Sequence, residues 1–175
     1  MTQHTFKIRR TVCCVLSALF SLPVVAQPNL NGETGYLNMP DGRIEADGTL
    51  RTGFSFAKPY SNIWSSISIS PRIEVTGRYA RVMSGAIGNG TTYWNGYGDY
   101  KDKAISGKLL LIEEDWLAPS LVFGLEDVMG TGIWKSTYVA ASKKFGELDT
   151  TLGVGSGRIN GVFAGMRYAP ASWDG

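Results

Sequence analysis

The chain has 175 residues, with 17 Lys and Arg against 15 Asp and Glu and a formal net charge of +2, and this length suggests one domain. Both cysteines and the single histidine lie in residues 1–26. The rest of the chain therefore excludes Cys–His and Ser–His–Asp nucleophiles, zinc sites built on Cys or His, and disulfides. It also contains no phosphate loop and no dinucleotide fingerprint, so we expect no cofactor and no metal.

Residues 1–26 have the features of a secretory signal peptide. Lys7, Arg9 and Arg10 precede an apolar run from 11 to 25, and Ala26 precedes a plausible cleavage site. This run is too short for a membrane-spanning helix, which needs about 20 residues. Cys13 and Cys14 lack the approach of a lipoprotein cleavage site, so we predict no lipid anchor. Export to the outer membrane is the expected localisation.

Removal of the signal peptide changes the charge balance of the chain. Three of the 17 basic residues lie in residues 1–26, which leaves 14 against 15 acidic residues and a net charge of −1. The apparent basicity therefore gives no case for nucleic acid as a partner.

The remaining chain predicts an all-β fold, because all 22 glycines fall here and no long helical stripe appears. Residues 27–47 form a turn-rich lead-in to a β domain at 48–175. In that domain, bulky residues on every second position indicate an antiparallel up-and-down meander of about eight strands. The candidates are 50–57, 62–70, 72–79, 103–112, 120–126, 135–145, 148–155 and 161–168. The longest loop is 83–102, and a second Gly-rich loop covers 127–134.

Three features favour an outer-membrane β-barrel over the main alternative, a soluble periplasmic β-sandwich that binds a partner. The chain carries an export signal, and the polar positions of its strands are rich in Ser, Thr and Gly. Aromatic residues also fall largely near strand ends, where barrels place aromatic girdles. They are Tyr60, Trp64, Tyr79, Trp116, Trp134, Tyr138 and Tyr168. Because the chain does not end on an aromatic strand residue, we expect either a small barrel or the first part of a larger one.

Several segments resemble one known family. They are 35–40 (GYLNMP), 47–51 (DGTLR), 53–56 (GFSF), 97–104 (YGDYKDKA), 130–132 (GTG) and 141–146 (ASKKFG). In this order they resemble the N-terminal part of the YjbH family, whose members are longer outer-membrane β-barrel proteins linked to exopolysaccharide and capsule production. The resemblance implies a non-enzymatic role in polysaccharide export or assembly. It also implies outer-membrane lipid, polysaccharide and other secretion proteins as partners.

Two groups of residues are candidates for contact with a polymer. Aromatic and polar side chains of the long loop, Tyr93, Trp94, Tyr97, Asp99 and Tyr100, suit stacking on sugar rings, although they equally suit packing of the loop. Charged side chains on the polar strand positions could line a lumen, or could neutralise one another in a plug. These are Arg51, Arg72, Glu74, Arg78, Lys108 and Arg167.

A glycosidase is the remaining alternative, and it would need two carboxylates about 5–10 Å apart. Glu113, Glu114 and Asp115 lie in one turn, whereas Asp99 and Asp102 lie in the long loop at the other end of the intervening strand. We expect the two groups to lie too far apart to act together.

Overall fold

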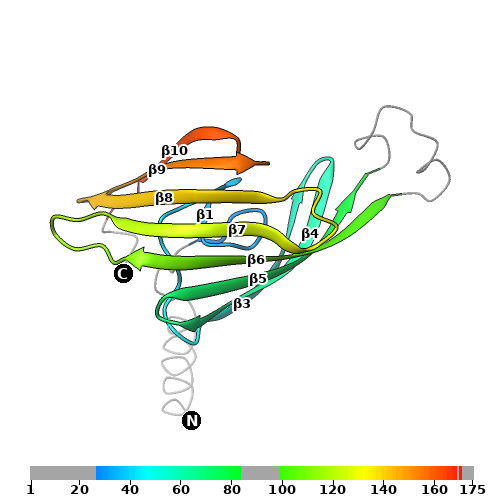
Figure 1. The fold of residues 1–175 in the computed structure, drawn as a ribbon, viewed down its shortest axis with the longest axis horizontal. Coiled ribbons are helices and arrows are strands. Elements are labelled where there is room, and N and C mark those ends of the chain that lie inside the picture. Colours follow the sequence, from blue (N-terminus) through cyan, green and yellow to red (C-terminus); the bar gives the residue numbers. More distant parts are fainter. Residues whose placement is uncertain (1–26, 84–98, 169, 171–175) are drawn as a thin grey trace, which may run out of the picture.

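The computed structural model describes residues 27–83, 99–168 and 170, and its long strands form one antiparallel sheet (Figure 1). The strands are β3 (Leu50–Ala57), β4 (Tyr60–Ser70), β5 (Ile73–Val82), β6 (Tyr100–Ile112), β7 (Ser120–Gly130), β8 (Ser136–Phe145), β9 (Leu148–Gly157) and β10 (Gly161–Tyr168). Each strand pairs with its neighbours in sequence, so the predicted eight-stranded meander is confirmed.

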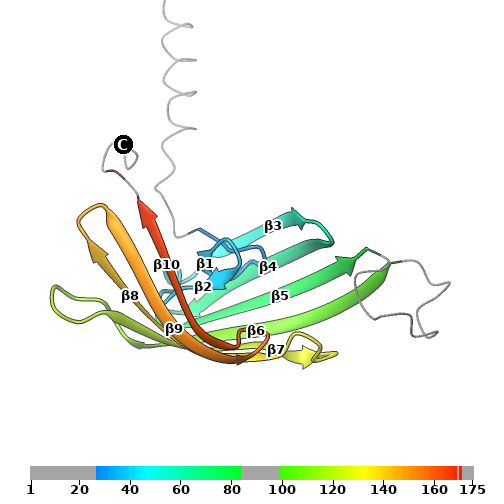
Figure 2. The same cartoon turned by 90° about the horizontal axis from the view of Figure 1, so that it is seen from above.

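The sheet is open within the described part of the chain. β3 pairs only with β4, and β10 pairs only with β9, so the eight strands are not closed into a barrel. Figure 2 shows the sheet curving into a trough. No helix in the described ranges is long and apolar enough to cross a membrane.

Residues 27–49 are called the cover segment here, and most of this segment lies inside the trough (Figure 2). The segment contains two short strands that the sequence did not predict, β1 (Gly35–Tyr36) and β2 (Met39–Pro40), which pair with each other. It is bonded to the wall at widely separated strands. The backbone N–H of Gly42 donates to Ser142 Oγ of β8 at 2.7 Å, and Asn62 Nδ2 of β4 donates to the Leu30 carbonyl at 3.0 Å.

The two faces of the sheet differ sharply in polarity. The face against the cover segment, called the covered face here, buries mainly polar side chains, including Ser66, Glu74, Thr76 and Lys108. The opposite face, called the apolar face here, exposes large hydrophobic side chains. Their exposed fractions include 76% for Phe54, 65% for Ile63, 61% for Leu152, 77% for Val162 and 74% for Met166. The alternation predicted from the sequence is therefore confirmed.

A small apolar cluster sits within the mainly polar covered face. It consists of Leu110, Val122, Tyr138, Ala140, Ile159 and Phe163, with Ile44 of the cover segment packed against it. Two of its rings lie over glycines on adjacent strands, Tyr138 over Gly124 and Phe163 over Gly153. A Cβ atom at either glycine would overlap the ring. Part of the high glycine content thus makes room for aromatic side chains.

Two expectations about local structure are wrong. Trp64 and Tyr138 do not belong to an outward-facing aromatic girdle, because both are buried on the covered face. The Gly-rich loop expected at 127–134 is shorter, because β7 continues to Gly130. After an irregularity in register, Met129 and Gly130 pair with Ile105 and Ala104 of β6.

Candidate functional site

Buried ion pairs fasten the cover segment to the covered face. Lys108 Nζ lies 3.2 Å from Asp41 Oδ1, and each side chain is only 1% exposed. The same ammonium donates to the carbonyls of Thr34 and Arg43 at 2.8 and 2.6 Å. All three acceptors belong to the cover segment, so Lys108 of β6 binds this segment at three residues.

A second network joins the segment to β3 and β5. Arg51 Nη1 lies 2.7 Å from Glu45 Oε1, and Arg51 Nη2 donates to Thr34 Oγ1 at 2.8 Å. The buried Glu74 accepts from the Thr34 backbone N–H at 2.8 Å and from the Thr34 hydroxyl. Two carboxylates and one guanidinium thus share a buried space, with hydroxyl and amide donors satisfying the remaining lone pairs.

A third network lies near the start of β9. Arg43 pairs with Glu114 and Asp149, and Arg167 Nη2 also pairs with Asp149 at 2.8 Å. Burial lowers the pKa of Arg43, but its hydrogen bonds to Asp149 and Glu114 outweigh burial and raise the pKa above its ordinary value. Arg43 therefore remains a cation and holds this part of the cover segment against the sheet.

Glu33 is the most strongly perturbed carboxyl of the cover segment. It is 2% exposed, and the Tyr138 hydroxyl donates to Glu33 Oε2 at 3.2 Å. Burial, followed by repulsion from Glu126, raises the pKa of Glu33 from 4.5 to about 7. Its charge consequently changes in the neutral pH range.

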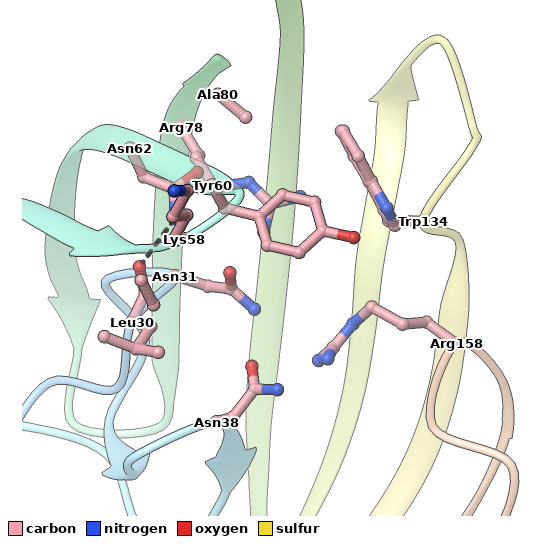
Figure 3. A pocket seen from close by; sticks show the side chains of 11 residues that line it. Leu30, Asn31, Asn38, Lys58, Tyr60, Asn62, Arg78, Ala80, Trp134 and Arg158 are labelled. Carbon is pink, nitrogen blue, oxygen red and sulfur yellow. Dashed lines mark hydrogen bonds between the residues drawn. The ribbon is translucent and has the colours of Figure 1, made fainter. Parts of the chain in front are cut away.

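A cavity of about 480 Å³ opens between the cover segment and the wall (Figure 3). It lies at the end of the sheet where β3 ends and β4 begins. Its lining combines three cations, two aromatic rings and three amides with small apolar groups. The lining residues are Leu30, Asn31, Asn38, Ala57, Lys58, Tyr60, Asn62, Arg78, Ala80, Trp134 and Arg158.

The charges around the cavity are unequally compensated. Arg158 forms a two-pronged pair with Glu126, through Nε at 2.9 Å and Nη2 at 2.7 Å. Arg78 and Lys58 form no ion pair with a described residue, and the buried Nε of Arg78 has no hydrogen-bond partner there. The Arg78 guanidinium instead lies 5.5 Å from the Trp134 ring centroid. The cavity therefore presents net positive charge beside an aromatic ring.

The loop residues predicted to contact sugar are only partly described. Tyr93, Trp94 and Tyr97 lie outside the described residues. Asp99 forms an ion pair with Arg81, and the Tyr100 ring lies edge-on to Trp134 at a centroid distance of 6.3 Å. Tyr100 thus touches a residue of the cavity wall, whereas nothing tests its contact with sugar.

The charges predicted to line a lumen divide into two groups. Arg51, Glu74, Arg78, Lys108 and Arg167 all lie on the covered face, where the cover segment or the cavity faces them. Arg72 differs, because it is exposed in the β4–β5 turn and its Nη1 donates to the Leu111 carbonyl at 3.4 Å.

Several residues of this site were not singled out from the sequence. Asn31, Asn38, Lys58 and Arg158 line the cavity, and Glu33, Asp41 and Glu45 carry the carboxylates of the cover segment. The only signal was an unusual number of Asn, Asp and Glu residues before the first long strand. That signal equally suits a solvated leader, so it did not identify a buried segment.

The carboxylates considered for a glycosidase occupy opposite ends of β6. Asp102 accepts from the Thr131 hydroxyl at 2.7 Å near the start of the strand, whereas Glu114 pairs with Arg43 just beyond its end. Eleven residues from Asp102 to Glu113 span roughly 36 Å at about 3.3 Å each. These two groups therefore do not meet. In the described ranges, no group of three or more Asp, Glu, His or Cys is placed to hold a metal ion.

Comparison with known proteins places the chain in a family. A family model described as "Exopolysaccharide biosynthesis protein YbjH" matches residues 28–170. The "Uncharacterized lipoprotein YjbH" of Escherichia coli (strain K12) is 34% identical over 128 residues, which are 73% of this chain but only 18% of that protein. No solved structure matches. Since the family match extends over most of the sequence, the chain belongs to the YjbH family.

Proposed function

We propose that the chain forms part of the wall of an outer-membrane β-barrel that assists exopolysaccharide export or assembly. The observation that carries this proposal is the inverted polarity of the sheet. Polar and charged side chains are buried under the cover segment, whereas large hydrophobic side chains are exposed on the apolar face. Lipid is the environment in which such an outward face is favourable, because each hydrophobic side chain there leaves water.

Strand length and sheet edges support the same proposal. The strands have 8 to 13 residues, and about 9–11 tilted residues cross a bilayer. An open edge in hydrocarbon leaves unpaired backbone groups, each of which costs several kcal/mol. A closed barrel would therefore need further strands beside β3 and β10. The Escherichia coli relative is long enough to contain such strands, because the matched residues are only 18% of it.

The proposed role in polysaccharide export rests on the family description, which refers to exopolysaccharide biosynthesis. The proposed location at the outer membrane agrees with the lipoprotein name of the relative. The role is non-enzymatic, with lipid, polysaccharide and other secretion proteins as partners. The cavity between the cover segment and the wall offers a polar surface, which a hydrated polymer tolerates better than an apolar one.

A soluble periplasmic sandwich fits these observations less well. In a sandwich, two sheets pack through their apolar faces. Here the small β1–β2 sheet lies on the polar side, and no second sheet covers the apolar face within the described residues. The experiment described next therefore distinguishes the sandwich from the barrel.

Spin labels on the apolar face test the proposal. Single cysteines replace Ile63, Leu152 or Val162, with Glu147→Cys in the β8–β9 turn as an aqueous control. In reconstituted membranes we expect the three apolar-face labels to collide often with oxygen and rarely with a water-soluble nickel complex, and the Glu147 label to do the reverse. A sample without an added cysteine measures the background labelling, including that from Cys13 and Cys14 in any chains that retain residues 1–26.

Two results contradict the barrel. Low collision rates with both reagents mean that protein covers the apolar face, as in a sandwich, and high rates with nickel mean that water covers it. The export role is tested separately, by deleting the gene in the strain that makes the polymer. Surface polymer that stays at the wild-type level contradicts that role even where the barrel is correct.

A further inference from the structure

We propose that the cavity at Arg78 and Trp134 binds an acidic saccharide, a sugar unit that carries a carboxylate. This proposal rests on the proposed function, because it names the chemical class of the polymer that the protein would handle. It concerns a different surface from the apolar face, so the two proposals are tested by separate experiments.

The charge of the cavity selects an anion. Three of its lining side chains are cations and no lining residue is a carboxylate. Glu126 offsets Arg158, but Arg78 and Lys58 have no ion-pair partner among the described residues. A partly buried guanidinium without an ion-pair partner is costly even beside an aromatic ring, and a carboxylate that bridges two of its N–H groups would offset that cost.

The aromatic side chains favour a sugar over a bare anion. Trp134 lies at the cavity wall with Tyr60 edge-on at a centroid distance of 6.1 Å and an interplanar angle of 83°. Figure 3 shows the Tyr60 ring projecting toward Trp134 across the cavity. An amphipathic ring beside hydrogen-bonding groups suits a ligand with one apolar side and one wet side.

The amides supply partners for sugar hydroxyls. The side chains of Asn31 and Asn38 project into the space in front of Arg158 (Figure 3). An amide both donates and accepts, which matches a hydroxyl group better than a purely cationic site does. The volume of about 480 Å³ lies within the usual range of ligand pockets, so one or a few sugar units are an appropriate size.

The cavity also lies near residues that the sequence singled out. Tyr100 packs against Trp134, and Asp99 precedes Tyr100 at the start of β6. The predicted sugar-contacting residues that the structure describes therefore occur at the same end of the sheet as the cavity.

Calorimetry on the purified protein in detergent tests the proposal. The probes are tetragalacturonate, an acidic sugar oligomer, and maltotetraose, a neutral oligomer of equal length. We expect tetragalacturonate to bind at least tenfold more tightly, and its affinity to fall when salt is raised from 0.05 to 0.5 M, because ions screen the charges.

Variants locate the binding. Arg78→Gln should weaken tetragalacturonate binding at least tenfold, since a hydrogen bond to a charged group contributes about 1.5–3 kcal/mol. Asn38→Ala is an exposed change that should weaken binding about threefold without disturbing the fold. The matched control is Arg72→Gln, which removes the same charge from the β4–β5 turn outside the cavity and should leave affinity unchanged.

Three results overturn the proposal: equal affinity for the two oligomers, no binding of either oligomer, or full affinity of Arg78→Gln. These results leave the membrane proposal intact, because the spin-label experiment decides that one. Conversely, spin labels that find the apolar face covered by protein would overturn the barrel, whereas selective tetragalacturonate binding by the same protein would still support the cavity.

Discussion

The covered face and the apolar face belong to the same strands and alternate residue by residue, yet opposite interactions stabilise them. On the covered face, Lys108 and Asp41 form an ion pair in which both side chains are 1% exposed. On the apolar face, side chains such as Leu152 and Val162 are exposed to the surroundings. The comparison teaches that strand periodicity determines which residues share a face, whereas what covers each face determines its energetics.

The largest expected effect comes from breaking the buried pair of the covered face. Lys108→Met removes the ammonium and leaves the Asp41 carboxylate buried without its partner. Loss of one member of a buried pair costs about 3–5 kcal/mol. Urea unfolding in detergent, followed by tryptophan fluorescence, measures this loss.

The control is the double variant Asp41→Asn with Lys108→Met. It removes both charges, so it should recover much of the stability lost in the single variant. A double variant as unstable as Lys108→Met alone would mean that the hydrogen bonds of Lys108 to Thr34 and Arg43, and not its charge, hold the cover segment.

A charge placed on the apolar face should have the next largest effect. Leu152 is 61% exposed in β9, so Leu152→Arg creates no steric conflict within the described sheet. In lipid the charge costs about 2–4 kcal/mol near the membrane centre, whereas in water such a change costs at most about 0.5 kcal/mol. Unfolding in reconstituted membranes gives the value, with Leu152→Met as the conservative control. A cost within the aqueous range contradicts a lipid-facing apolar face.

The sequence predicted the sheet well because strand periodicity is local information. The expected strands 50–57 and 161–168 coincide with β3 and β10, and the others differ only at their ends. The predicted alternation along the strands was also correct, since Ile63 in β4 is exposed whereas its neighbour Trp64 is buried. Trp64 was nevertheless assigned to a girdle, because an aromatic residue has no sequence signal that distinguishes a buried site from an interfacial one.

The candidate site was much less predictable, because it depends on contacts between residues far apart in sequence. Arg78 and Lys108 were recognised as polar-face charges, but Asp41 as the partner of Lys108 was not. The cavity needs Asn38 of the cover segment and Arg158 of the β9–β10 turn to lie close together. No periodicity within either segment indicates that proximity.

A smaller effect should appear in the pH dependence of stability through Glu33. Its pKa is raised from 4.5 to about 7 by burial and then by Glu126. Between these pH values the folded state holds a proton that the unfolded state has lost, so stability is fully present below about 4.5 and is lost as pH rises through 7. The contribution is on the order of 3 kcal/mol. Nearby Glu74 and Lys108 act on the same carboxyl with opposite signs.

Glu33→Gln provides the test, because glutamine stays neutral at every pH. We expect the variant to gain stability relative to the unmodified protein as pH rises from 5 to 8, measured by urea midpoints at each pH. The Tyr138 hydroxyl retains an acceptor in the glutamine side chain, so the comparison isolates the charge. A difference between the two proteins that is independent of pH contradicts the raised pKa.

The smallest expected effect comes from the exposed counterpart of the buried pair. Arg81 pairs with Asp99 while its side chain is 59% exposed, so water and salt already screen the attraction. Arg81→Gln should change the free energy of unfolding by less than about 1 kcal/mol. The same urea titration used for Lys108→Met measures it, at low and high salt. If Arg81→Gln cost as much as Lys108→Met, burial would not be what distinguishes the two pairs. We expect the loss in unfolding free energy of Arg81→Gln to stay below about 1 kcal/mol and to disappear in high salt, whereas the loss of Lys108→Met should not depend on salt. That result would mean that the cover segment strengthens the buried pair by excluding water from it.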